Sequence, residues 1–120
     1  MQKNIFGEDL ITCSTNPLTG YTRSGCCEYF EEDYGQHTVC VVLTEDFLRF
    51  SLDKGNDLIT PHPEWDFPGL GPNDKWCLCA LRWKEALEND VAPPIVLEAT
   101  HESILEIIDE KTLFKHAYKK

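Results

Sequence analysis

The sequence predicts a small domain of the α/β or α+β class, with helices packed on a central sheet of three to four partly parallel strands. Two observations support this prediction. Short apolar, β-branched runs alternate with segments of helical spacing, an order typical of a layered sheet with parallel pairing. A chain of 120 residues, of which 42% are hydrophobic, is also long enough to bury one core. We therefore expect a single domain over residues 1–120.

The first 36 residues are expected to be irregular, because turn-forming residues recur through them. The segment from Asn16 to Gly20 carries Pro and Gly where a tight turn requires them, and Gly25 and Gly35 follow. The most regular structure expected in this region is one short edge strand near Asp9–Cys13.

The first central strand is expected at Thr38–Leu43, since this continuous apolar run has the length of a strand buried on both faces. Thr44 has a side chain suited to capping a helix, and Glu45 and Asp46 favour the positive end of that helix. Gly55 is suited to end it.

Residues 55–74 form a long loop that interrupts the pattern. Its prolines and glycines disfavour regular structure, whereas large apolar side chains such as Trp65 and Phe67 favour packing over disorder. Long packed loops in compact domains are usually functional, so the sequence points to a site here.

The remaining elements are expected to follow in quick succession. They are a strand at Lys75–Ala80, a helix at Leu81–Asn89, a third strand at Ile95–Ala99, and two helices that begin at Thr100 and Asp109. The predicted order is thus strand, helix, loop, strand, helix, strand, helix, helix.

Charge and hydropathy exclude several classes of partner and say nothing of the oligomeric state. Twenty-one acidic residues against 11 basic ones give a net charge of −10, which repels phosphate backbones and anionic lipid, so neither nucleic acid nor a membrane is expected as a partner. The sequence also lacks an export-type segment and an apolar run of membrane-spanning length. We therefore expect a cytoplasmic location, with the six cysteines as thiols rather than a disulfide framework.

Cysteine and histidine are the residue types in this chain best suited to redox chemistry, catalysis or metal binding. In an extended strand the side chains of Cys77 and Cys79 would point to the same face. There they could be core residues, a redox pair or metal ligands. A tetrahedral zinc site is the cofactor that such soft ligands indicate, with candidate ligands Cys27, His37, Cys40 and Cys79. A structural zinc-binding domain is therefore one alternative.

A thiol-dependent enzyme is a second alternative. The candidate nucleophiles are Cys26, Cys27 and Cys79, and the candidate bases are His37 and His101. A capping role at a helix start is the competing interpretation of His101.

The leading hypothesis is a domain that binds a small molecule, with a cleft formed by the 55–74 loop and by strand ends near Cys79 and Thr100. Polar and aromatic side chains around these positions are the ligand-binding candidates: Asn56, Asp57, Trp76, Arg82, Glu98 and His101. An interaction protein that docks a partner through the Trp-bearing loop is a further alternative. The phosphate-loop, dinucleotide-binding, zinc-protease and serine-hydrolase motifs do not occur.

An ordered set of short motifs resembles one known family, the domain of unknown function family numbered 2237. The motifs are Cys13–Gly20, Arg23–Cys27, His37–Cys40, Gly55–Leu58, Phe67–Leu70, Trp76–Ala80, Arg82–Trp83, Ala92–Pro94 and Leu97–His101. The resemblance runs from about Asn4 to His116. It implies a short single-domain protein and carries over no activity, cofactor or catalytic residue.

Overall fold

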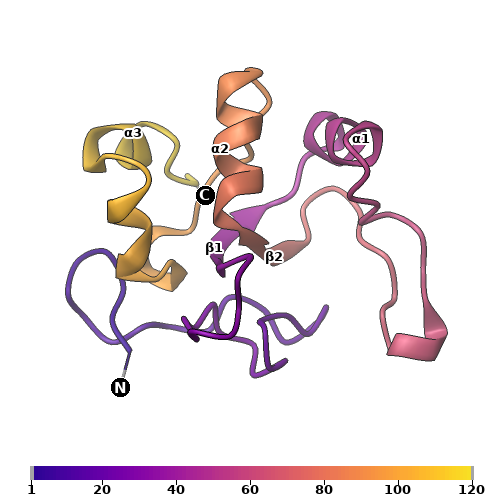
Figure 1. The fold of residues 1–120 in the computed structure, drawn as a ribbon, viewed down its shortest axis with the longest axis horizontal. Helices are drawn as coiled ribbons and strands as arrows, with labels where there is room; N and C mark the ends of the chain where they lie inside the picture. Colours follow the sequence, from indigo (N-terminus) through magenta and orange to yellow (C-terminus); the bar gives the residue numbers. More distant parts are fainter. Residues whose placement is uncertain (1, 120) are drawn as a thin grey trace.

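The computed structural model describes residues 2–119, which form a small α+β domain (Figure 1). Its helices and strands are β1 (His37–Val42), α1 (Glu45–Asp53), β2 (Lys75–Cys79), α2 (Ala80–Glu88) and α3 (Glu110–Lys115). Short 3-10 turns occur at Pro63–Trp65, Leu97–Ala99 and Glu102–Glu106. No helix within residues 2–119 is long and apolar enough to cross a membrane.

The sheet differs from the predicted one. Within residues 2–119 it has two strands, β1 and β2, which pair antiparallel. The predicted three- to four-stranded, partly parallel sheet is therefore not confirmed. The reason is that the loop returns the chain to the end of β1 where it left: the Leu43 amide donates to the Asp74 carbonyl (2.8 Å), and the Asn73 amide donates to the Leu43 carbonyl (2.8 Å). Because the chain enters β2 at the end of β1, β2 can pair with β1 only in the antiparallel direction.

The predicted third strand at Ile95–Ala99 is reduced to a single paired residue. Ile95 forms isolated bridges with Val41 and with Ala117, and the chain then turns into the 3-10 segment Leu97–Ala99. The pairing begins directly after Pro94, whose ring removes an amide donor from any longer ladder. The contribution of this segment to the sheet therefore ends after one residue.

Several local predictions are confirmed. The Thr44 hydroxyl accepts from the Phe47 amide (3.1 Å) at the start of α1, and Gly55 follows that helix with a positive φ of 87°. Asp109 occupies the N-cap position of α3. The cap predicted at Thr100 is wrong by one residue, because His101 caps a 3-10 turn while the Thr100 hydroxyl accepts from the buried Cys40 amide (3.1 Å).

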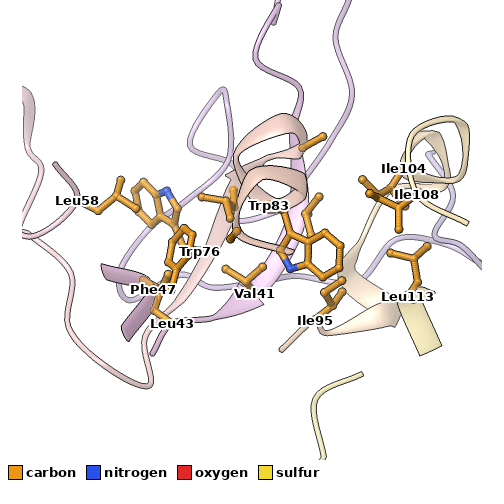
Figure 2. Close-up of a cluster of buried hydrophobic side chains, with 14 of the residues drawn as sticks. Val41, Leu43, Phe47, Leu58, Trp76, Trp83, Ile95, Ile104, Ile108 and Leu113 are labelled. Atoms are coloured by element: carbon orange, nitrogen blue, oxygen red, sulfur yellow. The ribbon is translucent and has the colours of Figure 1, made fainter. Parts of the chain in front are cut away.

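Trp83 of α2 lies at the centre of the hydrophobic core (Figure 2). Its indole is fully buried and donates to the Pro93 carbonyl (3.0 Å), which satisfies its one polar group. Ile95 lies against it, with Leu113 of α3 to one side and Trp76 to the other. The core thus joins α2, the sheet and the C-terminal segments.

The irregular N-terminal region covers the opposite face of the sheet, where a second buried cluster holds four cysteines. The expectation that all six cysteines are thiols is wrong, since Cys13 is bonded to Cys40 and Cys27 to Cys77. The Cα–Cα separations are 5.7 and 5.2 Å, within the range of disulfides. The pairing arises because Cys40 and Cys77 lie directly opposite each other in the ladder, and the N-terminal region brings one further cysteine to each.

Candidate functional site

A cleft of about 430 Å³ lies between the 55–74 loop, β2 and the N-terminal region. Its walls come from residues 20–23, from loop residues between Asn56 and Phe67, and from Trp76–Cys79 together with His37. Segments far apart in sequence thus meet around one space, and the loop forms one side of it. This volume is within the range of small-molecule sites.

His37 is held at this cleft by a buried carboxylate. Asp33 is almost fully buried, and it accepts from the His37 amide through Oδ2 (2.8 Å) and from the His37 ring Nδ1 through Oδ1 (2.8 Å). Because an ionised carboxylate can only accept a hydrogen bond, Nδ1 carries the hydrogen, and the neutral imidazole has its lone pair on Nε2. The Asp33 contact therefore fixes both the tautomer and the orientation of the ring.

Glycine at position 35 leaves room for this imidazole. A Cβ added to Gly35 would lie 2.8 Å from Cε1 of His37, a distance that side-chain carbon atoms do not adopt. The Tyr21 ring stacks on the imidazole, with ring centroids 6.4 Å apart. The ring is thus confined by Asp33, Gly35 and Tyr21.

Cys79 is the ladder partner of His37. A bulge between His37 and Val39 interrupts the regular ladder at this pair, and bulges re-aim side chains. Both His37 and Cys79 line the cleft, so the thiol and the imidazole border the same space. Cys79 is half-buried, and it is the N-cap residue of α2, where the positive end of a helix dipole lies. A cysteine and a histidine that line one cleft are the residue types of a nucleophile and its general base.

The loop wall is closed by its own backbone. His62 and Phe67 pair across a short hairpin, and the Leu70 amide donates to the Leu58 carbonyl (2.9 Å). Gly69 has a positive φ of 77°, and a Cβ there would overlap the carbonyl oxygen of Ile59. The loop therefore requires glycine at this close approach.

The base of the loop is packed, whereas its tip is not. Leu58 and Leu70 are buried, and Phe67 contacts the edge of Trp76 with ring centroids 5.6 Å apart. Trp65 is 70% exposed and stacks on His62 at 4.6 Å. The loop is thus anchored by its leucines and Phe67 rather than by Trp65.

Charges of both signs face the cleft. Hydrogen bonds from Thr60 and from the Ile59 amide hold the pKa of the Asp57 carboxyl below its usual range, so Asp57 is a carboxylate at neutral pH. The Arg23 guanidinium lies over the Trp76 ring, 5.1 Å from its centroid. A ligand in the cleft therefore meets one fixed anion and one fixed cation beside an aromatic face.

The structure brings some of the candidate residues together and separates others. Five of them line the cleft: His37, Asn56, Asp57, Trp76 and Cys79. Arg82 lies outside it, 3.4 Å from Glu85 on the surface of α2. Glu98 is exposed and is also outside; its carbonyl accepts from the buried Asn4 side chain (3.1 Å).

His101 has a structural position away from the cleft. Its Nδ1 accepts from the Ser103 amide (3.0 Å), and its own amide donates to the Thr38 carbonyl (3.0 Å). Burial lowers the pKa of His101 below its ordinary value, although the nearby carboxylates of Glu102 and Glu28 oppose this shift. The ring is therefore held neutral as a cap.

The remaining cysteine candidates lie apart from the cleft's imidazole. Cys27 and Cys40 are in disulfides, and Cys26, a free thiol among the residues described, donates to the Thr12 hydroxyl (3.8 Å). The four zinc-ligand candidates thus fall into two places: Cys27 and Cys40 in the sulfur cluster, and His37 and Cys79 in the cleft. They do not form one metal site.

Asp33 is the main site residue that the sequence did not reveal, along with Tyr21, Arg23 and His62. Its four-residue separation from His37 was a usable signal, because a carboxylate and a histidine at this spacing can meet across one turn. Because Asp33 directly follows Glu31 and Glu32, the sequence indicated instead that it is one of several solvent-exposed acidic residues.

Comparison with known proteins agrees with the resemblance seen in the sequence. The family model described as "Uncharacterized protein conserved in bacteria (DUF2237)" matches residues 3–117, nearly the whole chain. No curated protein matches the chain.

Proposed function

We propose that this chain, which belongs to the DUF2237 family of uncharacterized bacterial proteins, binds a small organic molecule in the cleft and acts on it through the Cys79 thiol. His37 serves as the base, and Asp33 serves as the residue that positions it. The observation that carries this proposal is the pairing of His37 with Cys79 at the cleft, with the buried Asp33 bonded to the imidazole.

The proposed chemistry is nucleophilic attack by sulfur on an electrophilic carbon of the ligand. Nε2 of His37 takes the proton of the thiol as Sγ of Cys79 forms a bond to a carbon that is doubly bonded to a heteroatom. The electron pair of that π bond moves to the heteroatom, which then takes the proton from the imidazolium. Asp33 stabilises the imidazolium that results, because its carboxylate remains bonded to Nδ1. This division of roles assigns a task to each of the three groups: the thiol and the imidazole at the cleft, and the buried acid bonded to the imidazole.

The other walls support binding of the ligand. Trp76 and Phe67 supply apolar surface, and Asn56, Asp57 and Arg23 supply the polar groups that orient a small molecule. A thermal-shift screen of small metabolites tests this part of the proposal, because a ligand at 100 times its Kd stabilises the native state by about 2.7 kcal/mol.

Alkylation kinetics test the role of Cys79, with Cys26 as an internal control. Both are half-buried free thiols in the part of the chain described, but only Cys79 has His37 as its ladder partner. Mass spectrometry after iodoacetamide treatment at pH 7 should show Cys79 reacting about tenfold faster or more, given the usual size of general-base effects.

The variant His37→Asn should remove this advantage and leave the rate at Cys26 unchanged. Gly35→Ala should act in the same direction, since its Cβ displaces the imidazole while the backbone is left in a conformation open to alanine. Equal rates at the two thiols in the unaltered protein would refute the proposed nucleophile.

An interaction protein remains the second candidate, favoured by the exposed Trp65 at the loop tip. Tryptophan is enriched at interaction hot spots, and this one is not required for packing the base of the loop. If it docks a partner, the chain should migrate in a bacterial lysate as a larger species than the purified protein, and Trp65→Ala should return it to the position of the purified protein. An unchanged profile for the variant would count against this function.

A cytoplasmic location stays a prediction. The two disulfides bear on it, since glutathione and thioredoxin keep most cytoplasmic cysteines reduced. Trapping thiols in living cells with a membrane-permeant alkylating reagent would establish which state the chain has there.

A further inference from the structure

We propose that the four cysteines beneath the N-terminal region form a binding site for one zinc ion when their two disulfides are reduced. The site consists of Cys13, Cys27, Cys40 and Cys77. It is distinct from the proposed catalytic pair, His37 and Cys79, and it does not depend on the proposed function.

The two disulfides lie against each other. The sulfur atoms of Cys13, Cys27 and Cys77 are all within 4.8 Å of one another. Cys40 is bonded to Cys13 and faces Cys77 across the ladder. Four sulfur atoms from four separate points of the chain therefore meet in one place.

This spacing is close to that of a tetrahedral metal site. A Zn–S bond of about 2.3 Å places the four sulfurs of such a site about 3.8 Å apart. Reduction frees each bonded pair to separate. The sulfur of Cys13 lies within 4.8 Å of those of Cys27 and Cys77, so each of these two distances has at most about 1 Å to close. Cys40 is not among the three sulfurs that are all within 4.8 Å of one another, so its side chain has to move for its sulfur to join them.

The backbone around the cluster is held by bonds that do not involve sulfur. The Cys77 amide donates to the Thr19 hydroxyl (2.8 Å), and the Cys40 amide donates to the Thr100 hydroxyl (3.1 Å). The Cys13 amide donates to the Gly25 carbonyl (2.8 Å). Reduction therefore leaves these ligand positions supported, as a metal site requires.

Burial of the four reduced cysteines favours the binding of a cation. All four cysteines are buried, and Ala99 and Val96 pack against them. Four thiolates in such surroundings need a compensating charge, and a divalent, thiophilic ion that accepts tetrahedral geometry supplies it. Neither an imidazole nor a carboxylate is needed to complete the set of four ligands.

The proposed site has two states joined by thiol–disulfide exchange. Two molecules of a small disulfide such as glutathione disulfide accept four electrons from the four zinc-bound thiolates. Two protein disulfides form, Zn²⁺ leaves, and four glutathione thiolates are released and take up protons from water. The oxidised state is the one described here.

Metal titration of the whole chain tests the proposal. Protein reduced with dithiothreitol and desalted without oxygen is titrated first with Co²⁺ and then with Zn²⁺. We expect one equivalent of Co²⁺, with the visible absorption of tetrahedral cobalt thiolate, and its displacement by zinc. The oxidised protein should show no such absorption.

Two sets of variants locate the metal. Cys27→Ser and Cys40→Ser should each weaken zinc binding at least tenfold, whereas Cys26→Ser/Cys79→Ser, which removes the other two thiols, should bind normally. A reduced protein that binds no metal, or binding that is lost only in Cys26→Ser/Cys79→Ser, would overturn the proposal.

A measurement without variants covers the case in which the serine variants do not fold. Zinc should protect four of the six cysteines of the reduced protein from alkylation and leave Cys26 and Cys79 reactive. Glutathione disulfide should then release one equivalent of zinc to a chelating dye. Alkylation of all six thiols at saturating zinc would contradict the assignment.

Discussion

Removing the longer disulfide is the perturbation whose magnitude follows most directly from the structure. Cys27 and Cys77 are 50 residues apart, and in the chain-entropy treatment a closed loop of this length destabilises the unfolded state by about 4 kcal/mol. The separation of 27 residues between Cys13 and Cys40 gives about 3.5 kcal/mol. Small domains have about 5–15 kcal/mol of stability in total, so either loss is a large part of it.

The double variant Cys27→Ala/Cys77→Ala should therefore unfold at a much lower urea concentration than the oxidised wild type. Unfolding is followed by tryptophan fluorescence, to which the fully buried Trp83 contributes, in the presence of a chelator so that metal does not contribute to stability. The matched control is Cys26→Ala/Cys79→Ala, which removes the same number of sulfur atoms without removing a cross-link. Equal midpoints for the two double variants would refute this reasoning.

Three further predictions concern single positions. Because burial lowers the pKa of His101, the unfolded chain binds more protons just below pH 6.5, so stability should decrease as the pH is lowered through this range. Urea midpoints at pH 7.5 and 5.5 should converge in His101→Asn, and an unchanged difference would contradict this. Gly69→Ala should lower the free energy of unfolding in urea by at least about 1–2 kcal/mol from the positive φ alone, and by more because the new Cβ overlaps the Ile59 carbonyl oxygen. An unchanged stability would show that the loop backbone can move apart at this contact. Thr44→Ala removes the cap of α1 and should cost about 1 kcal/mol in the same assay, whereas Thr44→Ser should retain most of the stability.

Local signals in the sequence were sufficient for the elements that carry them. Thr44 caps α1 because its hydroxyl reaches an amide three residues ahead, a contact that depends on no distant part of the chain. The strand at Thr38–Leu43 was predicted within one residue at either end, since its apolar run must be buried. The loop was also recognisable, because its prolines and glycines exclude regular structure.

The candidate site was predictable only in part. His37, Asn56, Asp57, Trp76 and Cys79 were candidates from their residue types and their neighbours in sequence, and all of them line the cleft. Their common position depends on how the loop returns to β2, which no local pattern specifies. His101 was a candidate for the same reasons, yet its ring is a structural cap.

The sequence by itself determined the family, the main helices and strands and the loop that borders the cleft, because each of these depends on residues that are near one another in the chain. Only the tertiary structure decided the antiparallel direction of the sheet, the Asp33 contact that orients His37, and the meeting of Cys13 and Cys27 with Cys40 and Cys77. Sulfur chemistry depends on distances of a few ångströms between residues as many as 50 positions apart, and such distances are set by packing rather than by spacing in the chain.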